Sequence, residues 1–294
     1  MNKFFIRYGN IYIILSFVLI LLLINIENFF KDRYGESSLL SKFNDKKNNS
    51  FNFIAHAGGG FKSKTYTNSK PAVLNAVKNG FKLIELDLLV TPDKDIIAAH
   101  DWNSFYNLCR KILNPSELIS VSSYEEFHKC SSQSEMKLIN QRWLKNFLDK
   151  NQDILIVTDQ IQDFKFLHTK FSEYDDRFIV EAHSILGYLT AKQYFPYVAL
   201  TFNDGRRYKY FTNFFNIKYI IIKSGLLSKY KSHLNKLIKK GTIVMMHTSN
   251  DEKFINENLD VYVSMFYTDF WDFNNNKCTE NIIDKINNSP CHTY

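Results

Sequence analysis

The sequence predicts an α/β protein, a (β/α)8 (TIM) barrel preceded by an N-terminal transmembrane helix, on three observations. Eight short apolar runs recur along the chain, segments with helical patterning separate them, and an apolar segment stands near the N-terminus. About 250 residues remain after that segment, which is typical of one barrel domain. The runs are rich in β-branched residues, as expected of parallel strands covered on both faces: Phe53–Ala55, Leu83–Val90, Ile154–Val157, Phe178–Val180, Tyr197–Phe202, Tyr219–Ile222, Thr242–Met246 and Val261–Phe266. A doubly wound open sheet would show the same alternation, so the pattern alone leaves both open.

Two of the segments between the runs predict helices that end at a glycine. These are Lys70–Asn79 and Leu226–Lys240, each followed directly by glycine, a residue that commonly ends a helix. The segment Ile96–Ala99 predicts an extra strand after the second barrel strand. The long stretch Trp102–Asn151 predicts an excursion over the barrel mouth.

The N-terminal segment predicts a membrane anchor. Residues Ile11 to Ile26 are nearly all apolar and follow Lys3 and Arg7. As a helix this segment spans about 24 Å, and flanking aromatic residues extend it to about 20 residues, enough to cross a hydrocarbon core. No cleavage site of small residues follows it, so we expect an uncleaved anchor rather than a signal peptide. We therefore expect an anchor at residues 1–30, a polar linker at residues 31–50 and the barrel at residues 51–294.

The net charge of +7 is modest and spread along the chain. Its densest lysine cluster, between Lys229 and Lys240, is interleaved with leucine and isoleucine and is typical of a solvated helix face. Attraction of that face to anionic lipid or nucleic acid is the alternative. No zinc-finger, basic-zipper or RNA-recognition signature occurs, so we expect no nucleic-acid partner.

The four cysteines, Cys109, Cys130, Cys278 and Cys291, lack CxxC spacing, which argues against a zinc site. Two disulfides would suit an exported domain, whereas four free thiols fit the sequence equally well. With the anchor, the first alternative predicts a single-pass membrane protein whose soluble domain lies on the extracytoplasmic side.

Polar residues gather at or near the C-terminal ends of the apolar runs. They are His56, Glu85, Asp87, His100, Asp101, Asp159, His247 and Asp269. In a parallel barrel all strand C-termini open onto one face, where active sites are built. These side chains should therefore converge in space.

Glu85 and Asp87 are the sharpest local signal. Residues two apart on a strand point the same way, roughly 6.5–7 Å apart, so two carboxylates inside an apolar strand would repel and be poorly solvated. A hard divalent cation would remove both costs. Pairing with Lys or Arg of a neighbouring strand is the alternative.

His56 and His100 are the candidate acid and base. Cleavage of a phosphodiester needs one of each, and two histidines at strand ends beside a carboxylate pair favour catalysis over a structural role. Gly58 and Gly59 follow His56 in a glycine run, which would let the backbone approach a phosphate oxygen closely.

Together these residues resemble the glycerophosphodiester phosphodiesterase family, in the wider group of phosphatidylinositol phospholipase C-like barrels. The resemblance extends from Ile54 to about Trp271, and the order and spacing of its segments make it specific. The segments that carry it are Ile54-Ala55-His56-Ala57-Gly58-Gly59, Tyr66-Thr67-Asn68-Ser69, Glu85-Leu86-Asp87, Thr91-Pro92-Asp93, His100-Asp101-Trp102, Val157-Thr158-Asp159, His247-Thr248-Ser249-Asn250 and Tyr267-Thr268-Asp269-Phe270.

The resemblance implies a site and a mechanism. His56 and His100 would be the acid and base, and Glu85 and Asp87 would bind Ca2+ or Mg2+ with Asp159 as third carboxylate. A neighbouring hydroxyl of the substrate would attack phosphorus and give a cyclic phosphate that water then opens. The cation would neutralise charge on the non-bridging oxygens.

The chain departs from the family pattern around the phosphate. Ala57 stands where members usually carry Arg, and Thr67 stands where they carry Glu before the retained Asn68. Asp159 and Ile161 replace the usual Glu and, two residues later, Lys. These joint changes imply a distinct subgroup, in which Asn68 still contributes to substrate binding.

Lys223 and Glu181 are further candidates for substrate binding. Lys223 either replaces the missing Lys or is a solvated lysine at a strand end. Glu181 and His183 stand where members often have Gln-x-Tyr, and they either line the pocket or form hydrogen bonds in the barrel mouth. His247 belongs to a segment typical of the barrel framework, and we expect Asp269 to cap a following turn.

We expect a metal-dependent phosphodiester hydrolase or lyase that acts on a glycerophosphodiester, or on a related phospholipid or glycan phosphodiester, at the membrane. One alternative is a non-catalytic, membrane-tethered barrel that binds phosphorylated glycans or lipid head groups, which the missing Arg, Glu and Lys favour. Another is a sphingomyelinase D-like phospholipid lyase, which accumulation of a cyclic product would distinguish.

Overall fold

The computed structural model describes residues 16–22, 51–110, 130, 135–202, 212, 217–275 and 277–278, without the side chains of residues 107–110. The chain divides into two compact units, Met1–Asn44 and Asp45–Tyr294. Residues 16–22 are helical, and none of the helices within the described ranges is long and apolar enough to cross a membrane. Most of the expected anchor and all of the expected linker lie outside these ranges, so both stay predictions.

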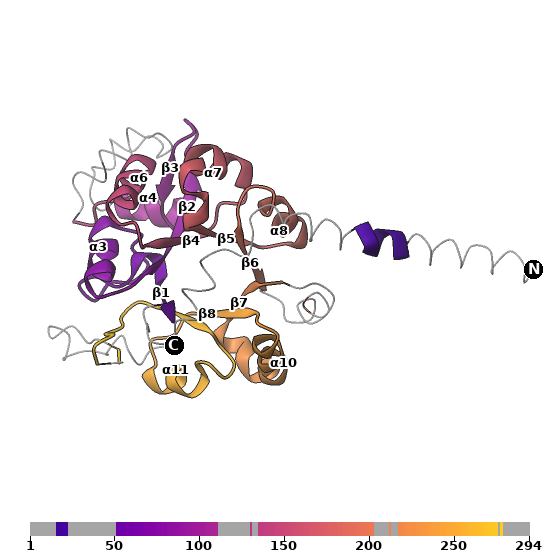
Figure 1. The fold of residues 1–294 in the computed structure, drawn as a ribbon. Helices are drawn as coiled ribbons and strands as arrows, with labels where there is room; N and C mark the ends of the chain where they lie inside the picture. Colours follow the sequence, from indigo (N-terminus) through magenta and orange to yellow (C-terminus); the bar gives the residue numbers. More distant parts are fainter. Residues whose placement is uncertain are drawn as a thin grey trace, which may run out of the picture. The chain divides into compact units, whose positions relative to one another are not determined.

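The second unit is a closed barrel of parallel strands (Figure 1). Its eight strands in the described part of the chain are β1 (Phe53–Ala55), β2 (Leu83–Val90), β4 (Leu155–Asp159), β5 (Phe178–Ala182), β6 (Tyr197–Phe202), β7 (Tyr219–Lys223), β8 (Ile243–His247) and β9 (Met265–Thr268). Ile54 of β1 is in register with Tyr267 of β9 on one side and with Leu83 of β2 on the other. Because β1 pairs with both neighbours, the sheet closes, and the barrel is confirmed over the open sheet.

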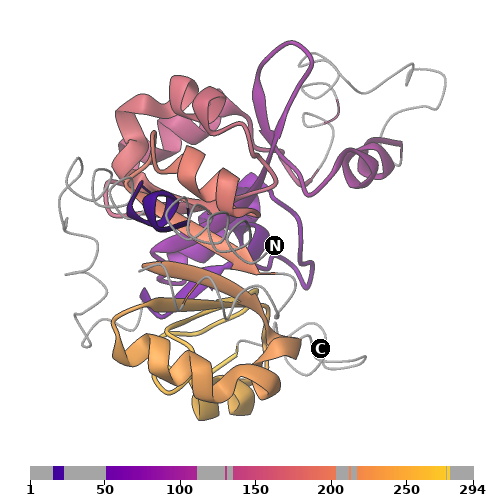
Figure 2. The same ribbon diagram turned by 90° about the vertical axis from the view of Figure 1, so that its right-hand side faces the viewer.

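Helices cover the outside of the strands (Figures 1 and 2). They are α3 (Lys70–Lys78), α6 (Gln141–Lys150), α7 (Phe164–Phe171), α8 (Ile185–Ala191), α10 (Leu227–Lys239) and α11 (Glu252–Asn258), with short 3-10 turns η2 (His56–Gly58), η4 (Ser172–Arg177) and η5 (Ser224–Leu226). The helix α4 (Trp102–Arg110) lies away from the barrel strands, and its Phe105 packs with Ile97 and Ala99 (Figure 2). Several begin at a side-chain cap, as where Ser69 accepts from the N–H of Ala72 and Asn140 from the N–H of Trp143. Such caps satisfy backbone donors that a helix leaves free at its start.

The predicted strands fall close to the observed ones, with one exception. β4 and β8 extend to Asp159 and His247, beyond the apolar runs that predicted them. The prediction of the last strand at Val261–Phe266 is wrong at its start, because β9 begins only at Met265 and ends at Thr268. Val261 instead lies in a turn and is 41% exposed, so its hydrophobicity did not mark a strand.

The extra strand is confirmed as β3 (Ile96–Ala98), which pairs antiparallel with the end of β2. In Figure 2 this β2–β3 hairpin extends beyond the barrel strands. Of the expected excursion, the structure describes α4 and α6, while residues 111–129 and 131–134 lie outside the described part.

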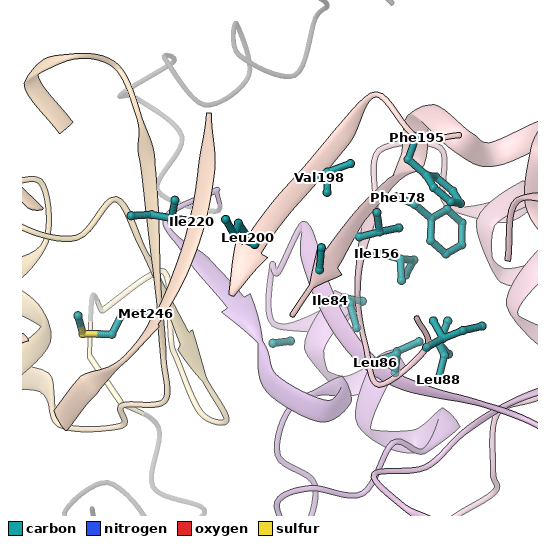
Figure 3. Close-up of a cluster of buried hydrophobic side chains, with 14 of the residues drawn as sticks. Ile84, Leu86, Leu88, Ile156, Phe178, Phe195, Val198, Leu200, Ile220 and Met246 are labelled. Atoms are coloured by element: carbon teal, nitrogen blue, oxygen red, sulfur yellow. The ribbon is translucent and has the colours of Figure 1, made fainter. Parts of the chain in front are cut away.

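The core lies between the barrel and its helices. On β2, Ile84, Leu86 and Leu88 are fully buried in one apolar cluster (Figure 3). Phe164 and Phe171 of α7 belong to the same cluster. Burying each such side chain contributes roughly 1.5–3 kcal/mol. Because successive strand residues face opposite sides, packing these three outward turns Glu85 and Asp87 into the barrel.

Cys130 and Cys278 are both disulfide-bonded, and no cysteine in the described ranges is free. Of the two alternatives left open by the sequence, disulfides rather than free thiols therefore hold for these two residues. The side chains of Cys109 and Cys291 lie outside the described part.

Candidate active site

A cavity of about 260 Å³ opens at the C-terminal ends of the barrel strands, where polar side chains were expected to converge. Seven of the predicted site residues line it: His56, Glu85, Asp87, His100, Asp159, Glu181 and Lys223. Tyr66, Gln160, His183, Thr201, His247 and Tyr267 complete its lining. Residues distant in the chain thus meet around a space large enough for a phosphate ester.

His56 is held by a carboxylate. It follows β1 in the turn η2 and is buried, and its Nδ1 lies 3.0 Å from Oδ1 of Asp269 just after β9. Asn250 donates to the other oxygen of Asp269 at 2.9 Å. Since an ionised carboxylate only accepts, Nδ1 carries the hydrogen, which leaves Nε2 as the basic nitrogen. We expected Asp269 to cap a following turn, and this is wrong, because its side chain instead orients His56.

His100 is held by its own neighbour, Asp101, whose Oδ2 lies 2.7 Å from Nδ1 of His100. Burial works against the charged imidazole, but this hydrogen bond and the nearby Asp87 raise the pKa of His100 above its usual value. The same contact, together with the N–H of Ser104, lowers the pKa of Asp101 to about 2. Asp101 therefore favours the protonated form of His100.

Tyr66 lies between the two histidines. Its ring makes an edge contact with His56, with 4.2 Å between the centroids, and another with His100 at 5.4 Å. Burial, followed by repulsion from Asp87 and Glu85, raises the pKa of its hydroxyl, so Tyr66 stays neutral.

The carboxylates of Glu85 and Asp87 are buried, and each accepts a hydrogen bond from the protein. The N–H of Ala57 donates to Oε2 of Glu85 at 2.6 Å, and Asn68 donates to Oδ2 of Asp87 at 2.8 Å. Asn68 also accepts from the N–H of Asp87 at 3.0 Å, so this amide fixes Asp87 from two directions. Burial, then repulsion from Asp87, raises the pKa of Glu85 well above its usual value, and burial raises that of Asp87.

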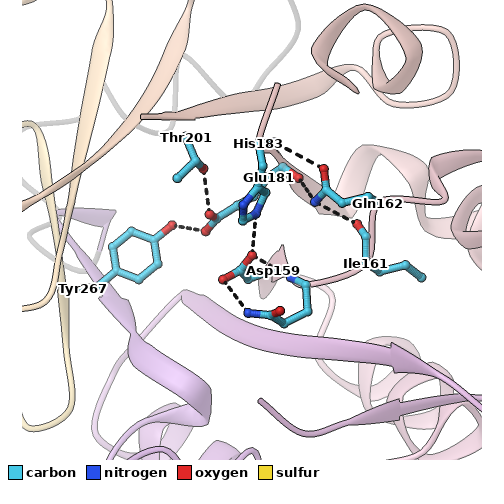
Figure 4. Close-up of polar contacts among 8 residues, drawn as sticks. Asp159, Ile161, Gln162, Glu181, His183, Thr201 and Tyr267 are labelled. Carbon is cyan, nitrogen blue, oxygen red and sulfur yellow. Dashed lines mark hydrogen bonds and ion pairs between the residues drawn. The ribbon is translucent and has the colours of Figure 1, made fainter. Parts of the chain in front are cut away.

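Asp159 lies opposite Asp87 in the β2–β4 register and joins a polar group with Glu181 and His183 (Figure 4). His183 donates from Nε2 to Oδ1 of Asp159 at 2.7 Å. Glu181 accepts from the hydroxyls of Thr201 at 2.9 Å and Tyr267 at 2.7 Å. Burial favours a protonated Asp159, but the hydrogen bond from His183 prevails and lowers its pKa. For Glu181, burial and then Asp159 raise the pKa well above its usual value.

His247 and Lys223 lie side by side at the ends of β8 and β7. Burial, then the nearby His56 and Lys223, lowers the pKa of His247 to about 4, so this imidazole is neutral. Its Nε2 is buried without a hydrogen-bond partner. His247 is thus part of the cavity wall rather than only barrel framework, and Lys223 is exposed yet lines the same cavity.

The glycine run does not line the cavity. A Cβ on Gly58 would come within 3.2 Å of Val73, and one on Gly59 would come equally close to Ala76, both on α3. At Gly60 a Cβ would lie only 2.1 Å from the ring of Phe270. These residues therefore allow close packing of the η2 loop, and the expected approach of their backbone to phosphate has no counterpart in the cavity lining.

The donor set fits a divalent cation. Glu85, Asp87, Asp159 and Glu181 place four carboxyl groups around one cavity, and their mutual repulsion adds to the raised pKa of Glu85. One ligand atom each of Asp159, Glu181 and His183 lie within 4.8 Å of one another, a spacing that one ion can bridge. Carboxylate-rich sites of this kind suit hard cations.

The sequence predicted the candidate catalytic and metal-binding residues more often than the residues that hold them in place. Asp269, Tyr267 and Thr201 hold His56 or Glu181, yet nothing near them in the sequence marks those contacts. Asp101 had a signal, because it directly follows His100 and could be read as its partner.

A parallel barrel with two carboxylate-held histidines and a carboxylate cluster at its strand ends defines an enzyme of the acid–base hydrolase class. Comparison with known families identifies the particular family. The profile of the glycerophosphoryl diester phosphodiesterase family matches residues 59–273. The chain belongs to this family and is a phosphoric diester hydrolase, which confirms the enzyme prediction over a non-catalytic barrel.

Solved structures agree on the fold. A glycerophosphodiester phosphodiesterase from Parabacteroides distasonis is 17% identical, with a TM-score of 0.57 and coverage of 74% of this chain and 92% of its own. One from Thermotoga maritima is 16% identical, with a TM-score of 0.56 and coverage of 74% and 94%. An Oleispira antarctica phosphodiesterase, solved with the product sn-glycerol-3-phosphate, is 11% identical, with a TM-score of 0.52 and coverage of 74% and 92%. A search of curated protein sequences gives no significant match.

Proposed function

We propose that this chain hydrolyses glycerophosphodiesters to an alcohol and glycerol phosphate, with His56 as base, His100 as acid and a divalent cation in the carboxylate cluster. The observation that carries the proposal is that both histidines, each held by a carboxylate through Nδ1, line the same cavity as Glu85 and Asp87. The glycerol phosphate bound to the Oleispira antarctica phosphodiesterase supports the substrate class.

The two histidines would act in sequence. Nε2 of His56 accepts the proton of the glycerol hydroxyl beside the phosphate, and that oxygen forms a bond to phosphorus. The bond from phosphorus to the departing alcohol oxygen breaks, and His100 donates its proton to that oxygen. The products are the free alcohol and a cyclic glycerol phosphate. Water then opens the ring, with the roles of the histidines exchanged.

Glu85, Asp87 and Asp159 would hold the cation. His183 orients Asp159 through its hydrogen bond, and Glu181 is close enough to share an ion with Asp159. Bound there, Ca2+ or Mg2+ would neutralise charge on the non-bridging phosphate oxygens. Asn68, which the sequence suggested for substrate binding, is better suited to orient Asp87, because both the NH2 and the carbonyl oxygen of its side-chain amide bond to Asp87.

Lys223 supports phosphate binding without the usual family Arg and Lys. Ala57, in place of the Arg, has only a backbone N–H to offer a phosphate, and that N–H already donates to Glu85. Ile161, in place of the Lys, is buried and carries no charge. Lys223 is the lysine that lines the cavity in the described part of the chain, and its exposed ammonium can reach an anion there. Its long, flexible side chain acts as a point charge rather than a fixed fork.

A membrane tether with the barrel on the extracytoplasmic side is part of the proposal. The apolar segment from Ile11 to Ile26 supports the tether, and the disulfides of Cys130 and Cys278 support an oxidising compartment. Such a location would bring the cavity to phosphodiesters released at, or still attached to, the membrane surface.

Phosphorus NMR of sn-glycero-3-phosphoethanolamine with the purified chain tests the proposal. We expect glycerol 3-phosphate to form, EDTA to stop the reaction, and Ca2+ or Mg2+ to restore it. Glu85→Gln should lower the rate at least 100-fold, whereas the exposed Glu257→Gln on α11 should not change it. Full activity in EDTA would contradict the cation, and no cleavage would contradict the substrate class. A cyclic product that persists would instead favour the sphingomyelinase D-like lyase.

A further inference from the structure

A second cavity, of about 500 Å³, adjoins the catalytic one. Most of its buried wall is apolar and comes from β3 and the residues after it, from α4 and from the segment before α6: Ala98, Ala99, Phe105, Met136 and Leu138. Its polar lining residues Lys64 and Ser104 are exposed, and Thr65 and Thr67 are half-buried. Asn68 is the buried polar exception among the described lining residues, and its amide is engaged with Asp87. The cavity thus has a mainly apolar interior and a polar rim, the composition of a ligand pocket.

The two cavities share Tyr66 and His100 and differ in everything else that lines them. Carboxylates, imidazoles, hydroxyls, the amide of Gln160 and the ammonium of Lys223 line the catalytic cavity, and none of its described lining residues is aliphatic and uncharged. The second cavity contains no carboxylate in the same part of the chain. His100, the proposed donor to the departing alcohol, therefore stands at the border between a charged compartment and an apolar one.

We propose that the second cavity binds a hydrocarbon chain on the departing alcohol of the phosphodiester, so that the preferred substrates are amphiphiles. The inference rests on the proposed function of His100 as the acid. When the phosphate lies among the carboxylates, the oxygen that His100 protonates faces the second cavity, and the group attached to it extends along Ala99, Phe105 and Leu138. Burial of each methylene there stabilises both the complex and the transition state.

A series of sn-glycerol 3-phosphate esters of methanol, butanol, hexanol and octanol tests this with the purified chain. We expect kcat/KM to rise roughly two- to fourfold per methylene from methyl to hexyl. A hexyl ether on the glycerol instead of on the departing alcohol should give much less gain. An equal gain from either position would show general attraction to hydrocarbon and would overturn the inference.

Two variants locate the effect. Met136→Trp fills the cavity from its buried wall, and Thr65→Trp narrows it from the half-buried rim without disturbing the interior. Each should lower the ratio of octyl to methyl kcat/KM at least tenfold, whereas Leu74→Trp, at a site 53% exposed on α3, should keep the ratio.

The outcomes separate the two proposals. The methyl ester could be cleaved with a kcat/KM that does not depend on chain length, or Thr65→Trp could lower kcat/KM equally for the octyl and methyl esters. Either result would overturn the apolar pocket, while the phosphodiesterase proposal would stand. If no ester of the series is cleaved, the proposed function fails and the inference fails with it.

Discussion

Nδ1 of His56 lies 3.0 Å from Oδ1 of Asp269, although the two residues are 213 positions apart in the chain. Both side chains are buried, and Asn250 holds the second carboxylate oxygen. The contact joins the first and last strands of the barrel, so closure of the barrel and orientation of the base depend on the same pair of strands.

Asp269→Asn should lower kcat about 100- to 10,000-fold with little change in KM, because the amide can present an N–H to His56 and favour the wrong tautomer. Steady-state kinetics on a glycerophosphodiester measure this. Asp163→Asn, in which the carboxyl only caps α7, is the matched control and should keep full activity. A normal kcat in Asp269→Asn would remove the dyad from the mechanism.

The acid should reveal itself in the pH dependence. Activity that needs protonated His100 is present below its pKa and is lost as the pH rises through it. Since Asp101 raises that pKa, Asp101→Asn should shift the alkaline limb of kcat/KM to lower pH. The pH–rate profiles of both proteins test the direction, and a shift to higher pH would contradict the assignment of His100 as acid.

Asn68→Gly should weaken the affinity for Ca2+ or Mg2+ roughly 10- to 100-fold, because both hydrogen bonds that fix Asp87 are lost. Glycine tolerates the positive φ of 47° at this position, so backbone strain does not obscure the result. Isothermal titration calorimetry measures the affinity, with Asn235→Ala at a half-buried site on α10 as control. Unchanged affinity would mean that Asp87 is not a ligand or needs no support.

Gly60→Ala should destabilise the barrel by about 1–3 kcal/mol, because its Cβ would overlap the ring of Phe270. Gly225→Ala, which has no atom within 4 Å of the added Cβ, should change stability by less than about 0.5 kcal/mol. Denaturant unfolding compares the two. Equal stability would show that the η2 loop adapts and that packing does not explain its glycines.

The strands were predictable because apolar runs report burial on both faces, and most of the site followed from the polar residues at their ends. The failures have physical causes. Val261 continues an apolar pattern but sits exposed in a turn, so the last strand was misplaced. The absence of a Cβ at Gly58 and Gly59 allows close packing against α3, and no local pattern distinguishes such a glycine run from a phosphate loop.

Hydrogen bonds between side chains of different strands could not be predicted from the sequence, for a different reason. Tyr267 donates to Glu181 across 86 positions, and His183 donates to Asp159 from the next strand. Strand register decides such pairs, and a single sequence does not specify register. The sequence therefore named the residues that converge but not which of them hold one another.

The most direct test of the account is the rate of glycerol 3-phosphate release by His56→Ala and by His100→Ala. Each should lose about 100- to 10,000-fold in kcat with the fold intact by circular dichroism, whereas His168→Ala on α7, outside the cavity, should keep the wild-type rate. If either variant in the cavity retains the wild-type rate, the cleavage does not take place between these two imidazoles.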